Sequence, residues 1–142
     1  MVMKKIAALM ILAFSASAHC EVRVEDYCFV SIGGKPVRFE LRTYSDDSIN
    51  WSGAVVRYER SLKSIPLVLL SENIDEVEKG RPAEISRRWA EILNGSISGE
   101  YEMSSQGGNI NSMTYKNNKT KKKFDFDFDV NAQRTDGMGC NW

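Results

Sequence analysis

The sequence predicts a mainly β protein, built as an antiparallel β-sandwich or flattened β-barrel of about seven strands with one packed α-helix. Three observations lead to this prediction. Seven segments have the alternation or the short apolar run of a strand. Turn-forming glycine and asparagine residues separate several of them. One segment has the spacing of an amphipathic helix, and no repeat or low-complexity linker divides the chain.

The first two strands are predicted at 22–32 and 37–42, where apolar and polar residues alternate with the period of two that is typical of strands. Gly33 and Gly34 lie between them and predict a hairpin turn, because glycine adopts positive φ without steric cost. The apolar face of the first strand collects Val22, Val24, Cys28, Val30 and Ile32.

The next two strands are predicted at 49–58 and 65–70. Gly53 lies inside the first of them and indicates a bulge or a close backbone approach. Pro66 has no amide to donate, so we expect it at a strand start or a sheet edge. The acid-rich stretch 72–79 is expected to form a loop or a single loose helical turn.

The predicted helix covers 82–93. Pro82 suits a first helical turn, and Asn94-Gly95 supplies a C-terminal stop. Trp89 falls on the apolar side of this helix and is expected in the core. The apolar helical face collects Ile85, Trp89, Ile92 and Leu93.

The last three strands are predicted at 97–104, 110–116 and 122–131, and the turns between them at 106–109 and 117–120. In the final strand three phenylalanines alternate with three aspartates, which predicts an aromatic inner face and an acidic outer face. The aspartates do not form an EF-hand loop, because Val130 takes the place of the required glycine. The alternating residues are Phe124, Asp125, Phe126, Asp127, Phe128 and Asp129.

The N-terminus has the order of a bacterial-type secretory signal: Lys4 and Lys5, an apolar run at 6–14, then small residues up to Ala18. The apolar run has nine residues, whereas a membrane-spanning helix needs about twenty, so no membrane span is expected after cleavage. We therefore expect a signal peptide at 1–18, a single β-rich mature domain at 19–142 and a periplasmic or secreted location.

An exported chain meets an oxidising compartment, where paired cysteines form disulfides. We predict a disulfide between Cys28 and Cys140, because Cys28 lies on the apolar face of its strand and Cys20 lies in a terminus expected to fray. Cys20 is then free, capped or linked to another chain. Lipidation of Cys20 is the minority alternative, because Ser17 and His19 occupy the positions where lipoprotein signals carry a large aliphatic and a small residue.

The net charge of the chain argues against nucleic acid and anionic membranes as partners. The chain has 19 basic and 19 acidic residues, and signal cleavage removes two lysines, which leaves 17 against 19 and a net charge of −2. No basic footprint for nucleic acid or for an anionic membrane results.

The sequence contains few of the residues that catalytic or metal sites need. His19 is the only histidine and lies at the expected mature N-terminus, so triads and His/Cys zinc sites inside the fold lack a histidine. No phosphate-binding loop or nucleophile elbow is present. We therefore predict no enzyme, metal or cofactor, although a pair among the 19 acidic residues leaves a carboxylate-dependent hydrolase open.

Two segments are candidates for binding. Trp51, Ser52 and Gly53 would form a good binding loop if the tryptophan is exposed, although a buried core position is the commoner use of tryptophan. Lys119 and Lys121 belong to a lysine-rich turn that could contact phosphate or an acidic partner. The alternative for this turn is a solvated hairpin tip that discourages edge-to-edge aggregation.

A third candidate comes from a resemblance. The order of Tyr27-Cys28, Ser52-Gly53 with Tyr58, Lys63 and Cys140 is similar to that in bacterial inhibitors of C-type lysozyme, which are small exported β-barrels. The resemblance implies that a loop around Ser52 and Lys63 enters an enzyme's active-site cleft. The spacing of the tyrosines and the predicted helix depart from that family's pattern, so the chain is not assigned to it.

These observations predict a small exported, non-enzymatic binding protein whose partner is another protein, as an inhibitor or an immunity-type protein of the cell envelope. The alternatives are a structural envelope component linked through Cys20, a small-ligand-binding protein and the carboxylate-dependent hydrolase. The sequence does not set the oligomeric state.

Overall fold

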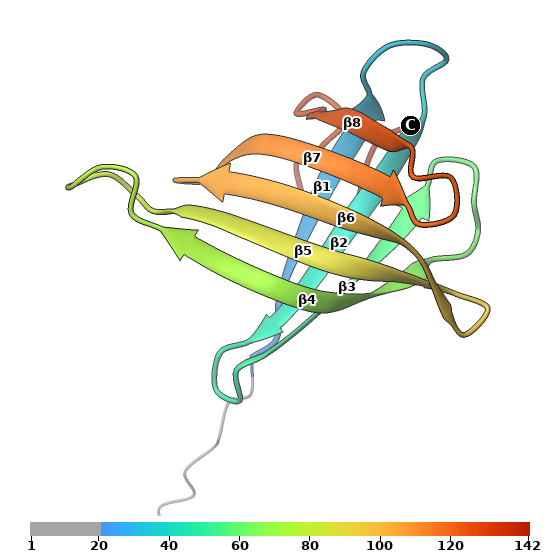
Figure 1. The fold of residues 1–142 in the computed structure, drawn as a ribbon. Helices are drawn as coiled ribbons and strands as arrows, with labels where there is room; N and C mark the ends of the chain where they lie inside the picture. Colours follow the sequence, from blue (N-terminus) through green and yellow to red (C-terminus); the bar gives the residue numbers. More distant parts are fainter. Residues whose placement is uncertain (1–20) are drawn as a thin grey trace, which may run out of the picture.

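Eight antiparallel strands close into a barrel in the computed structural model, which describes residues 21–142 (Figure 1). Each strand pairs with its neighbours in sequence, and the last strand returns to the first. The predicted signal peptide at 1–18 and Cys20 lie outside the described residues. The strands are β1 (Arg23–Ser31), β2 (Arg38–Asp46), β3 (Trp51–Tyr58), β4 (Ile65–Asp75), β5 (Glu84–Leu93), β6 (Ser96–Gln106), β7 (Asn109–Asn117) and β8 (Lys123–Phe128).

The predicted mainly β class is confirmed, and each of the seven predicted strands corresponds to a strand of the barrel. The sandwich alternative is replaced by a closed barrel, and the strand count is eight. No helix is found among residues 21–142, so none of the described residues forms a helix long and apolar enough to cross a membrane.

The predicted helix at 82–93 is wrong, because this segment is β5 and supplies the eighth strand. Ile85 and Trp89 are four residues apart, and such residues share a face in a strand as well as in a helix. Pairing along β4 and β6 decides in favour of the strand. Asn94-Gly95 is the turn of a β-hairpin, with φ of 50° and 74°, rather than a helix stop.

The apolar face expected for β1 is not the face that lines the barrel. Phe29 is fully buried in the core and Tyr27 packs against it, whereas Val24 and Ile32 remain exposed. Cys28 points to the outside of the barrel and is buried there by the C-terminal residues. The aromatic residues of β1 therefore take the inner face.

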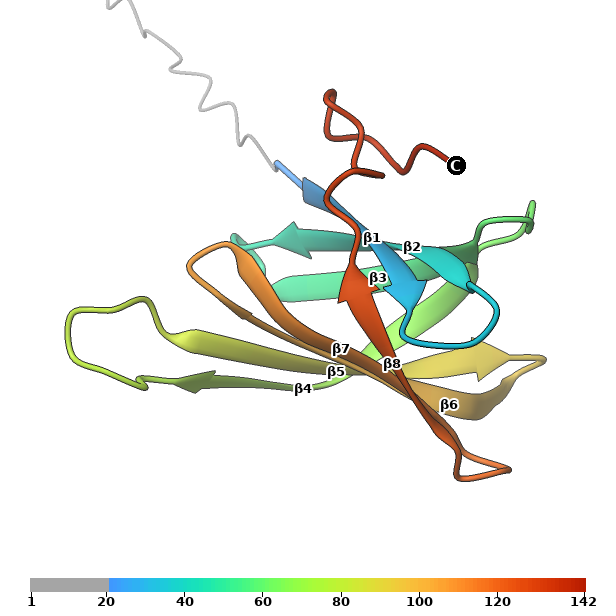
Figure 2. The same ribbon diagram turned by 90° about the horizontal axis from the view of Figure 1, so that it is seen from above.

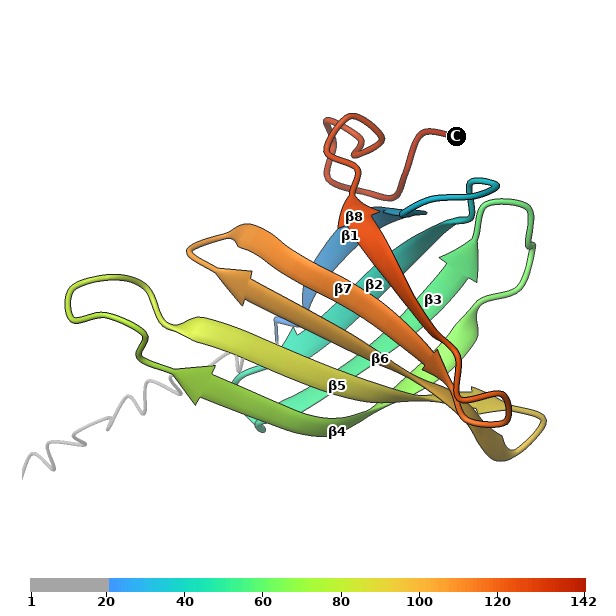
Figure 3. The same ribbon diagram turned by 45° about the horizontal axis from the view of Figure 1, so that its top comes forward.

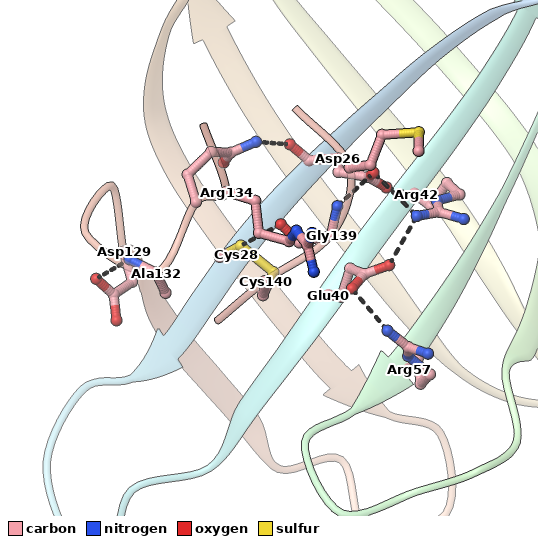
Figure 4. The surroundings of a disulfide bond; sticks show 12 residues. Asp26, Cys28, Glu40, Arg42, Arg57, Asp129, Ala132, Arg134, Gly139 and Cys140 are labelled. Atoms are coloured by element: carbon pink, nitrogen blue, oxygen red, sulfur yellow. Dashed lines mark hydrogen bonds and ion pairs between the residues drawn. A yellow bond between two sulfur atoms is a disulfide. The ribbon is translucent and has the colours of Figure 1, made fainter. Parts of the chain in front are cut away.

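The predicted disulfide between Cys28 and Cys140 is confirmed. It fastens residues 129–142, the C-terminal strap, to the outside of the barrel next to β1 (Figure 2). Arg42 holds Asp26 with two hydrogen bonds of 2.6 and 3.0 Å, and the Gly139 amide donates to the same carboxylate at 2.8 Å (Figure 4). The strap is thus fixed by polar contacts as well as by the disulfide.

A meander barrel has two ends, and they differ in this protein. The mouth end gathers the start of β1 and the connections 47–50, 76–83 and 107–108. The start of β1 at the mouth is not paired with β8, because β8 pairs with β1 only at Phe29–Ser31, near the opposite end of the barrel (Figure 3). Below the mouth, the side chains of the hydrophobic core fill the barrel interior. Among them, the rings of Phe39 and Tyr101 are in edge-to-face contact.

Candidate binding site at the barrel mouth

The structure separates the predicted site residues into two groups. Trp51, Ser52 and Gly53 begin β3 at the mouth end. The lysines lie at the opposite end, in the connection that follows β3 and in the turn between β7 and β8. These are Lys63, Lys119 and Lys121.

A cavity of about 340 Å³ lies at the mouth and includes all three residues of the first group. Its walls come from β1 to β5 and from the turn between β2 and β3. Trp89 of β5 also lines it and is only 1% exposed, which confirms its predicted place in the core. Further lining residues are Arg23, Glu25, Thr43, Asp46, Asp47, Leu69, Glu72 and Arg87.

Trp51 is the exposed aromatic residue of this site. Its side chain is 50% exposed, so the expected core position for it is wrong. The indole lies over Gly53, where an added Cβ would be 3.1 Å from the ring atom Cζ2. Gly53 therefore leaves room for the ring. The predicted bulge is not found in the pairing of β2 with β3, and the group that approaches Gly53 is a side chain rather than another backbone.

The turn before Trp51 is held by local hydrogen bonds. Asp46 is buried and accepts hydrogen bonds from the amide of Ser48, at 2.9 Å, and from its hydroxyl. Asn50 has φ of 51°, a conformation that asparagine tolerates better than most residues. Asp46 also pairs with Trp51 across the hairpin, so the chain enters β3 in a fixed geometry.

Charged side chains from three strands surround the mouth. Arg23 forms an ion pair of 2.6 Å with Asp47, and Arg87 forms one with Glu72. These residues were not predicted as site residues. Their sequence signal is weak, because Arg23, Glu72 and Arg87 are single charged residues within strands and Asp47 lies in the turn that follows β2.

Glu25 accepts a hydrogen bond of 3.1 Å from the Tyr27 hydroxyl. Burial raises the pKa of Tyr27 to about 12, and the charge of Glu25 adds to this effect. Tyr27 therefore remains a neutral donor over the whole physiological range.

The opposite end carries two separate lysine-containing loops. Asn117 caps the lysine turn by accepting amide hydrogen bonds from Lys119 at 3.0 Å and from Thr120 at 2.9 Å. Lys121 lines a shallow hollow on the outer face of β5 to β8, where acidic residues balance part of its charge. The residues of this hollow are Arg88, Glu100, Glu102, Thr114, Lys116, Lys121 and Lys123.

Ser52 and Lys63 are both exposed, but they do not share a loop. Ser52 lies at the start of β3 and Lys63 in the connection that follows β3, and the strand between them spans roughly 20 Å. The single loop implied by the resemblance to lysozyme inhibitors is therefore not formed. Ser52 belongs with the mouth, and Lys63 belongs with the far end of the barrel.

The chemistry available at the mouth is recognition by charge, hydrogen bonds and an indole ring. Among residues 21–142 no group of three histidine, cysteine or acidic side chains is placed to hold a metal ion. No protein-family model matches the chain, and comparisons with curated proteins and with solved structures gave no match.

Proposed function

We propose that this chain is an exported, non-enzymatic binding protein that recognises another protein through the barrel mouth, as an inhibitor or an immunity-type protein. The observation that carries the proposal is the half-exposed indole of Trp51, held in place over Gly53 at the edge of a polar cavity. Tryptophan is among the residues most enriched at the energetic centres of protein interfaces.

The fixed geometry of Trp51 supports this role. An exposed side chain that is already ordered loses little conformational entropy on binding, which favours affinity. Both neighbours of the indole belong to regular structure, because Gly53 lies within β3 and Asp46 accepts a hydrogen bond from the turn before Trp51. The surrounding ion pairs provide the polar rim that interfaces commonly have.

The test is capture of a partner from periplasmic extract by the mature protein, residues 19–142, with its disulfide intact. We expect one stoichiometric protein partner, and we expect W51A to bind it about 30-fold more weakly, the effect of losing a central tryptophan. The matched control is W142A, because Trp142 is also a partly exposed tryptophan but lies on the C-terminal strap.

Equal binding by W51A and the unchanged protein would contradict the proposal. Unfolding curves of both variants test for a folding defect. We expect none in W51A, because Trp51 is half exposed and its loss creates no cavity in the core.

A further inference from the structure

The loops at the far end of the barrel are strongly basic. The antiparallel topology brings four connections to this end, 32–37, 59–64, 94–95 and 118–122, and they lie on one side of the molecule (Figure 2). They contain six basic residues and one acidic residue, a net charge of +5, whereas the three connections at the mouth contain two basic and three acidic residues, a net charge of −1. The balanced charge of the whole chain therefore conceals a large difference between its two ends. The six basic residues are Lys35, Arg60, Lys63, Lys119, Lys121 and Lys122.

The charges of these six residues are not neutralised by neighbouring acids. All six residues are exposed, and none has a side-chain nitrogen within 4.0 Å of a carboxylate oxygen of residues 21–142. Glu59 is the one acidic residue of these connections, and it forms an ion pair of 3.5 Å with Arg38 of β2. The Asn117 side chain holds the lysine turn in shape through the amides of Lys119 and Thr120. The far end thus presents ordered cations whose charge is open to an outside partner.

Exposed apolar side chains lie on the same four loops. Leu62, in the connection 59–64, is fully exposed, with a relative exposure of 102%. Each of the other three connections contains or adjoins at least one large apolar residue that is exposed. A single exposed apolar residue is ordinary, but one on every loop of an end that also carries a net charge of +5 indicates contact with a partner. These further residues are Ile32, Val37, Leu93, Ile97 and Phe124.

This combination favours a lipid surface over a protein surface. The apolar residues are spread over four separate loops, whereas the centre of a protein interface is a closely packed apolar patch. An anionic bilayer suits both features of the far end. Its phosphate groups attract lysine and arginine, and the boundary between its headgroups and acyl chains accepts apolar side chains.

We propose that the far end of the barrel docks on an anionic lipid surface, with Leu62 at the boundary of the acyl chains and the lysine turn against the headgroup phosphates. The mouth lies at the opposite end, so it faces away from the lipid and stays accessible to a protein partner. The inference does not rest on the proposed function, because it uses no residue of the mouth.

The test is co-sedimentation of the mature protein, residues 19–142, with vesicles of equal parts phosphatidylglycerol and phosphatidylcholine, and with vesicles of phosphatidylcholine alone. The mature chain is used because the apolar run at 6–14 would itself bind lipid. We expect binding to the anionic vesicles only. Added salt should weaken it, because salt screens the attraction between the lysines and the phosphates.

A pair of charge variants locates the docking surface. K119Q/K122Q should weaken binding to the anionic vesicles about tenfold, because each lysine near such a surface adds to the attraction. The matched control K79Q/R81Q removes the same charge from the connection 76–83 at the mouth and should leave binding nearly unchanged. All four residues are exposed, so we expect the unfolding curves of both variants to match that of the unchanged protein.

A second pair tests the apolar contact. L62S should weaken binding to the anionic vesicles about fivefold, because the leucine side chain no longer enters the apolar boundary. The matched control is I49S, which removes an exposed aliphatic side chain from the connection 47–50 at the mouth and should not change binding.

Equal binding to the two kinds of vesicle, or equal affinity of the two variants within either pair, would overturn the inference. Binding of soluble polyglutamate as tightly as the vesicles, with no effect of L62S, would also overturn it and would identify an acidic protein as the partner of the far end. The proposed function fails or stands separately, because capture of a protein partner depends on Trp51, and we expect W51A to bind the vesicles like the unchanged protein.

Discussion

At the scale of single residues, the barrel interior contains a carboxylate that is satisfied by hydroxyl groups. Glu91 is 3% exposed and accepts hydrogen bonds from Ser98 at 2.7 Å, Tyr115 at 3.0 Å and Tyr101 at 3.1 Å. Buried polar groups stay stable when each finds such partners. This network explains why a glutamate is tolerated where the strand pattern calls for an apolar residue.

Replacing Glu91 by alanine should destabilise the protein by about 2 to 4 kcal/mol. The variant removes the acceptor that three hydroxyl groups share, although Tyr101 keeps its hydrogen bond with the Tyr58 hydroxyl and Ser98 keeps the one to the carbonyl of residue 91. Unfolding in denaturant measures the loss, and E102A provides the control at an exposed position of the neighbouring strand. Equal stability of the two variants would show that the hydroxyls find other partners.

The tyrosines around Glu91 predict alkaline sensitivity. Burial raises the pKa of Tyr115 to about 12, and it also raises the pKa of Tyr101. Since the unfolded chain releases these protons near pH 10, their contribution to stability is complete below pH 10 and is lost as the pH rises towards 12. The free energy of unfolding should fall between pH 10 and pH 12 by about 1 kcal/mol or more, and less in Y115F. A flat profile would contradict this assignment.

At the scale of elements, the strands that alternate clearly were predictable, and the one with mixed signals was not. In β8 the predicted aromatic inner face is confirmed for Phe126, which is buried, and for Phe128, which packs on the core, whereas Phe124 is exposed near the start of the strand. In β5 an apolar spacing of four fits two periods, and only its pairing with β4 and β6 distinguishes them. In β1 the alternation predicts the wrong inner face, because the strap buries Cys28 on the outside of the barrel while Phe29 lies in the core.

The candidate site could be predicted only in part for a related reason. Trp51, Ser52 and Gly53 are adjacent in the chain, so a single segment pointed to them. Glu25 and Arg87 come from strands whose register depends on the closed barrel, and their convergence on one cavity has no local sequence signal. Position in a sheet, rather than residue type, makes them part of the mouth.

At the scale of the whole molecule, closure of the barrel is shared between β8 and the C-terminal strap. β8 pairs with only three residues of β1. Beyond them the Asp129 amide donates to the Cys28 carbonyl at 2.8 Å, and the Gln133 side chain donates to the Asp26 carbonyl at 2.6 Å. The strap therefore satisfies backbone groups of β1 that β8 leaves open, and the disulfide keeps it there.

Removing the disulfide should destabilise the whole barrel. The Cys28–Cys140 bond spans 112 residues, and a loop of this length corresponds to about 4 to 5 kcal/mol in the chain-entropy model. The C28S/C140S double variant should thus unfold at a much lower denaturant concentration, while β1 and β8 keep their pairing in the folded state. C20S is the control, because Cys20 takes no part in this bond, and its midpoint should not change. A double variant as stable as C20S would mean that the polar contacts of Asp26 and Gln133 hold the strap without the covalent link.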